Sequence, residues 1–222
     1  MLRDILKRWW VIKMEEVKLL MRDETSRKYF SRSTKRIANL FIKNILKTLK
    51  EFNAKSILDI GCGTGYITKK IKNSLDVEIV GCDINTDRLS IASKTFGKEL
   101  VIADITKLPF KDSGFDAVIA LDLIEHLSDI NTAIGEIKRV LKNYVIITVP
   151  NEPFFRLANF LRGKNIRTFG NISDHVHHFN KHSLEKVLSK HFSKVQVKNN
   201  AIFGLWVYQN FMREGYNDIR FS

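Results

Sequence analysis

The segment 55–66 constrains the fold most, because a short apolar run is followed there by glycine at every second position. The run Ile57, Leu58 and Ile60 predicts a buried parallel strand. The three glycines that follow permit positive φ angles in a tight turn, and they leave the backbone open to close contact with a ligand. A helix is predicted directly after them, over 66–72. A strand, a glycine turn and a helix N-terminus predict a nucleotide-type site, because free N–H groups and the positive helix end face the ligand.

The spacing of the glycines excludes two common phosphate-binding patterns. The pattern G-x-G-x-x-G would need glycine at position 66, where the chain has Tyr66, and G-x-x-x-x-G-K-[ST] is absent. Asp59 precedes the turn and argues for a ligand that carries positive charge. Asp83 follows a second predicted strand over 77–82, where an acid can accept both ribose hydroxyls. An adenosine ligand with a cationic amino-acid tail would satisfy both acids.

The residues Leu58-Asp-Ile-Gly-Cys-Gly-Thr-Gly65 and Gly81-Cys-Asp83 resemble the class I S-adenosylmethionine-dependent methyltransferases, in the type 11 or small-molecule-like branch. The resemblance covers about 53–210 and is specific over 55–127. It implies an α/β fold, with a Rossmann-like, mostly parallel sheet of seven strands, helices on both faces and a C-terminal antiparallel hairpin. It also implies S-adenosyl-L-methionine as the cofactor. A nucleotide-like fold that has lost its ligand is the alternative.

The same resemblance implies roles for residues at the strand ends. Asp59 would serve the methionine end of the cofactor, Asp83 the ribose, and Asp104 with Ile105 the adenine. The fourth predicted strand, over 115–120, leads into the segment 121–127, which resembles the part of the family that touches cofactor and substrate. The predicted cofactor-binding residues are Asp59, Gly61, Cys62, Gly63, Gly65, Asp83, Ile84, Asp104, Ile105 and Leu121.

Histidines are the candidate catalytic residues. Methyl transfer by in-line attack on a sulfonium carbon depends mainly on alignment and exclusion of water, and an oxygen acceptor must also lose a proton. His126, His177 and His178 are the candidate bases. The alternative for His126 is a structural pair with Glu125, and the alternatives for the 175–178 histidines are a structural turn or a metal site. No Cys/His spacing typical of zinc occurs, so no metal is predicted.

The predicted domain organisation is an N-terminal helical cap over 1–52 and a cofactor-binding domain over 53–222. A substrate-side insertion is predicted over about 151–180. Helices are predicted over 2–22 and 33–52, and the first could pack on the domain, form a homodimer contact or lie on a membrane surface. No apolar run is long enough to cross a bilayer. Cys62 and Cys82 fit free thiols in a reducing cytoplasm better than a disulfide.

The net charge of +13 is uneven along the chain. Residues 56–150 hold 11 basic and 13 acidic residues, so both flanks carry the positive charge. Such a balance attracts nucleic acid, anionic lipid or an acidic substrate, or simply marks a solvated lysine-rich surface. The predicted function is methyl transfer to an O, N or C atom of an unidentified small molecule. The alternatives are an RNA-modifying methyltransferase, although no Asn-Pro-Pro-Tyr-type loop is present, and a non-catalytic cofactor-binding interaction protein.

Overall fold

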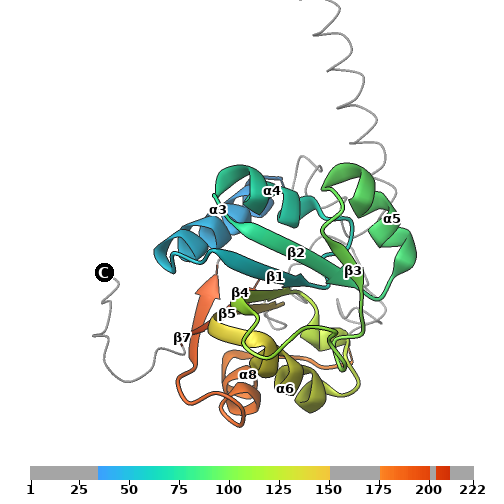
Figure 1. Ribbon diagram of the computed structural model, residues 1–222. Coiled ribbons are helices and arrows are strands. Elements are labelled where there is room, and N and C mark those ends of the chain that lie inside the picture. Colours follow the sequence, from blue (N-terminus) through green and yellow to red (C-terminus); the bar gives the residue numbers. More distant parts are fainter. Residues whose placement is uncertain (1–34, 151–175, 201–203, 211–222) are drawn as a thin grey trace, which may run out of the picture. The chain divides into compact units, whose positions relative to one another are not determined.

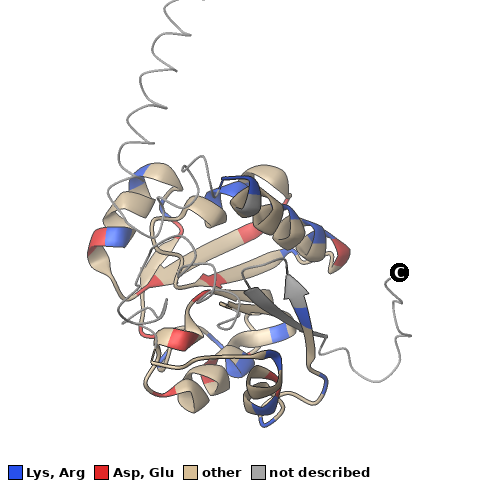
Figure 2. Ribbon diagram, turned by 180° about the vertical axis from the view of Figure 1, so that it is seen from behind, with Lys and Arg blue, Asp and Glu red and all other residues tan. Residues whose placement is uncertain are grey.

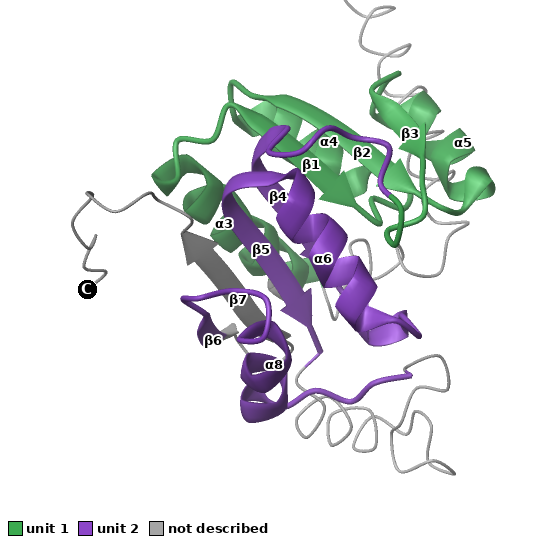
Figure 3. Cartoon of the chain, turned by 60° about the horizontal axis from the view of Figure 1, so that its bottom comes forward, with its two compact units in different colours: residues 1–107 green, residues 108–222 purple. Residues whose placement is uncertain are grey.

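The computed structural model describes residues 35–150, 176–200 and 204–210 (Figure 1). The chain divides into two compact units, residues 1–107 and residues 108–222, coloured separately in Figure 3. Within the described residues, five strands pair in parallel, three in the first unit and two in the second. The predicted α/β, Rossmann-like class with a parallel sheet is confirmed to this extent.

The first unit is built on three parallel strands in the order β3-β2-β1. Ile60 of β1 lies opposite Cys82 of β2, and Asp83 lies opposite Ile102 of β3, so the carboxyl ends of the strands meet at one edge. Ile57 and Leu58 are fully buried, as the apolar run predicts. The strands are β1 Ser56–Ile60, β2 Glu78–Asp83 and β3 Leu100–Ile102.

The helices of the first unit are amphipathic. Every third or fourth position of α3 is buried, while its lysines are exposed, which gives the basic stretches seen along this helix in Figure 2. Gly65 precedes α4, and the Asn85 side chain caps α5 by accepting a hydrogen bond from the Arg88 N–H at 3.0 Å. Both α4 and α5 contact β2. The helices are α3 Lys35–Glu51, α4 Tyr66–Ser74 and α5 Thr86–Thr95.

The second unit contains the parallel pair β4 and β5, with α6 alongside them (Figure 3). The α6 helix buries one apolar face, which includes Ile134 and Ile137. Strand β7 pairs antiparallel with both β5 and β6. The elements are β4 Phe115–Leu121, η1 Ile124–His126, α6 Ile130–Val140, β5 Leu141–Val149, α8 Lys181–Leu188, β6 Gln196–Asn200 and β7 Gly204–Asn210.

Within the described ranges, the predicted elements differ from the observed ones at their ends. The strand predicted over 77–82 is observed at Glu78–Asp83, and the strand predicted over 115–120 extends to Leu121. Strand β5 follows α6 directly, because α6 ends at Val140 and the chain becomes extended at once. The predicted helix over 2–22 and most of the predicted insertion, 151–175, lie outside the described residues. No helix in the described ranges is long and apolar enough to cross a membrane.

Candidate active site

Asp59 lies on β1 and is almost completely buried, with 3% of its surface exposed. Its Oδ2 accepts a hydrogen bond from the Thr68 Oγ1 at 2.6 Å. Burial raises the pKa of this carboxyl to about 7, the Thr68 hydrogen bond opposes the rise, and the charge of Asp83 adds to it. Asp59 is therefore held near the midpoint of its titration at neutral pH, where a cation beside it would favour the ionised form. Thr68 was not predicted from the sequence, although it lies in the first turn of the helix that follows the glycines.

The glycine turn adopts the left-handed backbone conformation at all three glycines. The φ angles of Gly61, Gly63 and Gly65 are 70°, 56° and 72°. A Cβ on Gly65 would lie only 3.1 Å from the Phe96 Cβ and 3.2 Å from the Ala92 Cβ, so this glycine is required by both conformation and space. The Gly61 and Cys62 N–H groups donate to the Cys82 carbonyl at 2.7 and 3.0 Å, which ties the turn to β2.

Asp83 joins the turn after β1 to the loop after β2. Its Oδ2 accepts from the Gly63 N–H at 2.9 Å, and its Oδ1 accepts from the Asn85 N–H at 2.8 Å. These two bonds fix the carboxylate at the carboxyl edge of the strands. Each carboxylate oxygen has a second lone pair, so the geometry permits further bonds to two hydroxyl groups of a ligand.

The two cysteines pack tightly and are poor nucleophiles. A Cβ on Gly81 would lie 2.9 Å from the Cys62 Sγ, so the absence of a side chain at position 81 makes room for this thiol. Burial raises the pKa of Cys62 far above its usual range and that of Cys82 to about 12. Both thiols are thus protonated at neutral pH. Cys62 therefore serves the turn through its packing and its backbone N–H, and it does not supply a thiolate.

The remaining predicted cofactor residues of the first unit differ in exposure. Asp104 is exposed, and its Oδ1 accepts from both the N–H and the Oγ1 of Thr106 at 2.8 Å, which lowers its pKa. Ile105 is buried, whereas Ile84 is 67% exposed at the end of β2. An exposed isoleucine next to Asp83 is suited to cover an apolar part of a ligand.

In the second unit, the end of β4 is fixed by a reciprocal pair with β5. The Asp122 N–H donates to the carbonyl and to the Oγ1 of Thr148 at 3.0 and 3.1 Å, and the Thr148 Oγ1 donates back to the Asp122 Oδ1 at 2.9 Å. Asp122 has a φ of 49°, so this tip is held in the left-handed region. Leu121, predicted to contact the cofactor, lies half-buried immediately before it. Thr148 was not predicted.

The three candidate histidines lie in this same unit. His126 ends η1 and is exposed, and His178 is also exposed. His177 is half-buried, and its N–H donates to the Glu125 carbonyl at 3.0 Å. The structure therefore brings His177 next to Glu125, the residue that precedes His126, although 52 positions separate His177 from Glu125 in the chain. His175 lies outside the described residues.

A second polar cluster fixes the loop Leu108–Asp112 in the second unit. The Arg139 guanidinium donates to the carbonyls of Leu108 and Phe110 at 2.8 and 2.7 Å and to the Asp112 Oδ1 at 2.8 Å. Glu136 receives two bonds from Arg139 and a third from the Leu108 N–H at 2.7 Å. Arg139 holds the pKa of Glu136 below its usual range. The pairing of Glu136 with Arg139 was not predicted from the sequence.

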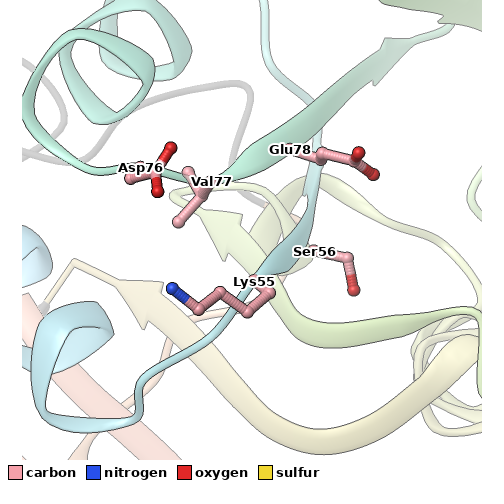
Figure 4. A pocket seen from close by; sticks show the side chains of 5 residues that line it. All are labelled: Lys55, Ser56, Asp76, Val77 and Glu78. Carbon is pink, nitrogen blue, oxygen red and sulfur yellow. The ribbon is translucent and has the colours of Figure 1, made fainter.

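An open cavity of about 420 Å³ lies at the opposite end of the first unit's strands (Figure 4). Its lining residues are Lys55, Ser56, Asp76, Val77 and Glu78. They lie at the amino ends of β1 and β2, whereas ligands of open α/β sheets bind outside the carboxyl ends. This cavity is therefore separate from the cofactor residues.

Residues 58–148 match the family model described as a methyltransferase domain. Curated relatives match less than half of the chain. An O-methyltransferase of Pyrenophora dematioidea is 33% identical over 105 residues, which are 44% of this chain and 39% of the relative. A probable tRNA methyltransferase 9B of Homo sapiens is 41% identical over 86 residues, which are 39% of this chain and 18% of the relative. The chain thus spans less than half the length of these relatives.

Solved structures share the fold over more of the chain. The PH0226 protein from Pyrococcus horikoshii OT3 has a TM-score of 0.63 at 22% identity, covering 81% of this chain and 92% of that one. The magnesium protoporphyrin IX methyltransferase of Synechocystis, solved with bound SAH, has a TM-score of 0.62 at 14% identity, covering 83% and 90%. Residues 58–148 of this chain are thus similar to the methyltransferase domain family, and the two solved structures share the fold of the chain.

Proposed function

We propose that this chain transfers the methyl group of S-adenosylmethionine to an oxygen of a small-molecule acceptor. The observation that carries the proposal is the fixed position of the Asp83 carboxylate, held by the N–H groups of Gly63 and Asn85 at the end of β2. An acid held there by backbone donors, beside three glycines with positive φ, suits an adenosine ligand better than a phosphate. The relatives named O-methyltransferase support oxygen as the acceptor atom.

The predicted cofactor residues fit this ligand in both charge and shape. When bound, the cofactor supplies an electrophilic methyl group on a positively charged sulfur. Asp59, with its pKa raised by burial, gains a counter-charge when a cationic amino-acid tail lies nearby. Asp83 would accept the ribose hydroxyls, and Ile84 would cover an apolar part of the ligand. Gly61, Gly63 and Gly65 would let the backbone approach the amino-acid tail closely, with Cys62 between them.

The remaining predicted residues complete the proposal. Asp104 and Ile105 would contact the adenine, and Leu121 would contact the cofactor from the end of β4. One of the three candidate histidines, His126, His177 or His178, is proposed to act on the acceptor. We also propose that the described strands belong to one seven-stranded, mostly parallel sheet whose antiparallel end is the β6–β7 hairpin. The strand order within each unit supports this arrangement.

A transfer RNA is the second candidate acceptor. The identity of 41% over 86 residues with a probable tRNA methyltransferase favours it, as does the charge of +13. The described part of α3 adds an exposed row of basic residues: Lys35, Arg36, Lys43, Lys47 and Lys50. A protein that neutralises several phosphates loses about 10³-fold or more of its affinity between 50 and 200 mM salt.

A labelled-methyl assay separates the two candidates. The protein would be incubated with methyl-tritiated S-adenosylmethionine and either a panel of phenols, comprising catechol, hydroquinone and 4-hydroxybenzoate, or bulk tRNA. We expect label in the phenol fraction, with little dependence on salt. Label that appears only in tRNA and disappears as salt rises would contradict the small-molecule proposal. Cofactor binding without label in any fraction would favour a non-catalytic protein.

A further inference from the structure

We propose that His177, and neither His126 nor His178, is the residue that contacts the acceptor hydroxyl and removes its proton. This inference rests on the proposed function and identifies one base among three candidates. Its starting point is the way the backbone is held. The Val176 and His177 N–H groups both donate to the Glu125 carbonyl at 3.0 Å, so this segment is fixed against η1. Because η1 follows β4, His177 lies beyond the carboxyl end of a parallel strand, where ligands bind in this class of fold.

The ring of His177 is held as firmly as its backbone. It stacks on the Phe179 ring, with 6.1 Å between the ring centroids and 29° between the planes. Phe179 is 4% exposed and so provides a rigid support. A ring fixed at both its backbone and its face has little freedom to turn, which suits a group that must be aligned with a reacting atom.

The Nε2 atom of His177 is the observation that indicates a ligand. It is buried, and among the residues that the structure describes it has no hydrogen-bond partner. Buried ring nitrogens are nearly always paired, so an unpaired one needs an explanation, and a missing ligand is one. His126 and His178 are exposed, so neither ring is held in a site from which water is excluded. In the described part, the buried Glu125 accepts a hydrogen bond from His177 through its carbonyl, and the exposed His178 is the next residue along the chain.

The proposed step balances in atoms and charge. The His177 Nε2 accepts the proton of the acceptor hydroxyl while the hydroxyl oxygen forms a bond to the methyl carbon. The carbon–sulfur bond breaks at the same time, and its electron pair stays on sulfur, which becomes a neutral thioether. The imidazolium then gives its proton to water. The step requires the neutral imidazole, whose Nε2 carries the lone pair that accepts the proton.

The test compares His177→Gln with the matched control His178→Gln, which changes the exposed neighbour in the same way. The probe is the phenol of the panel that is methylated fastest. Loss of a general base costs about 10²-fold or more in kcat, so we expect that loss in His177→Gln, with KM and the Kd for S-adenosylhomocysteine unchanged. The rate of the variant should then rise with pH without a plateau near neutrality. His178→Gln should stay within twofold of wild type.

A result of equal kcat in His177→Gln and wild type, or a reduced kcat with the wild-type pH profile, would overturn the assignment. A readout on the wild-type protein covers the case in which His177→Gln does not fold. Nitrogen-15 NMR of labelled histidines, in the complex with S-adenosylhomocysteine, should show one Nε2 signal that shifts when the phenol is added. If the cofactor binds and no histidine signal shifts with any phenol, His177 is not the acceptor contact. If the cofactor itself does not bind, the proposed function fails first.

Discussion

The buried carboxyl of Asp59 should make the unliganded protein less stable as pH rises. Its pKa is raised to about 7 in the folded state, from 3.8, so between these values the folded protein binds more protons than the unfolded chain. By linkage, the contribution of Asp59 to the free energy of unfolding is fully present below pH 3.8 and is lost as pH rises to about 7. A shift of about three units corresponds to about 4 kcal/mol in total, of which about 3 kcal/mol falls between pH 5 and pH 8.

The variant Asp59→Asn isolates this effect. Asparagine has nearly the same shape and can still accept the bond from the Thr68 hydroxyl, but it cannot ionise. Urea unfolding would be measured at pH 5 and pH 8 for both proteins. The free energy of unfolding of wild type should fall relative to that of the variant by about 3 kcal/mol across this interval. Subtracting the free energy of unfolding of the variant from that of wild type removes the contribution of the other titrating groups. If the free energies of unfolding of the two proteins change equally between pH 5 and pH 8, the reasoning is refuted.

Two further changes test the parts of the structure that hold the site. Gly65→Ala places a Cβ 3.1 Å from the Phe96 Cβ at a φ of 72°, so a loss of about 1–3 kcal/mol is expected in urea unfolding. In the control Gly135→Ala, the new Cβ in α6 meets no atom within 4 Å, so the protein should become more stable by about 0.5–1 kcal/mol. A Gly65→Ala variant as stable as this control would contradict the geometry. Arg139→Met removes the donors to the Leu108 and Phe110 carbonyls, and a loss of about 2 kcal/mol is expected, whereas Lys138→Met at the exposed neighbouring position should change little. Equal thermal melting points for these two variants would mean that Arg139 does not hold the loop.

The local patterns were sufficient to predict the glycine turn and the strand-end acid of the first unit. The strand, the alternate glycines and the strand-end acid follow one another in the sequence. Each is determined by a few neighbouring residues, through the φ angles that they permit or through their burial. The structure also places the Asp83 carboxylate against the Gly63 N–H, a contact that was not predicted from the sequence. The helix predicted over 66–72 and the strand predicted over 115–120 followed from the residue pattern in the same way, and both are observed.

The partners that hold these residues could not be predicted, because they come from distant parts of the chain. Thr148 pairs with Asp122 across 26 positions, and Arg139 reaches the Leu108 carbonyl across 31. Such contacts depend on strand register and on the rotation of α6, which a hydrophobic pattern fixes only to within a residue or two. A polar residue on a partly buried helix face, such as Glu136, is compatible with solvent or with a buried partner, and only the fold distinguishes them.

The most direct test of the account is calorimetric titration with S-adenosylmethionine and S-adenosylhomocysteine. Wild type should bind both with a Kd on the order of 1 μM, equivalent to about −8 kcal/mol. Asp83→Ala should weaken both by about 100-fold or more, because it removes the carboxylate and releases the Gly63 and Asn85 N–H groups. The control Asp87→Ala, in the exposed first turn of α5, should bind as wild type does. If the folded wild type binds neither ligand, or if Asp83→Ala binds as tightly as wild type, the proposed cofactor site is wrong.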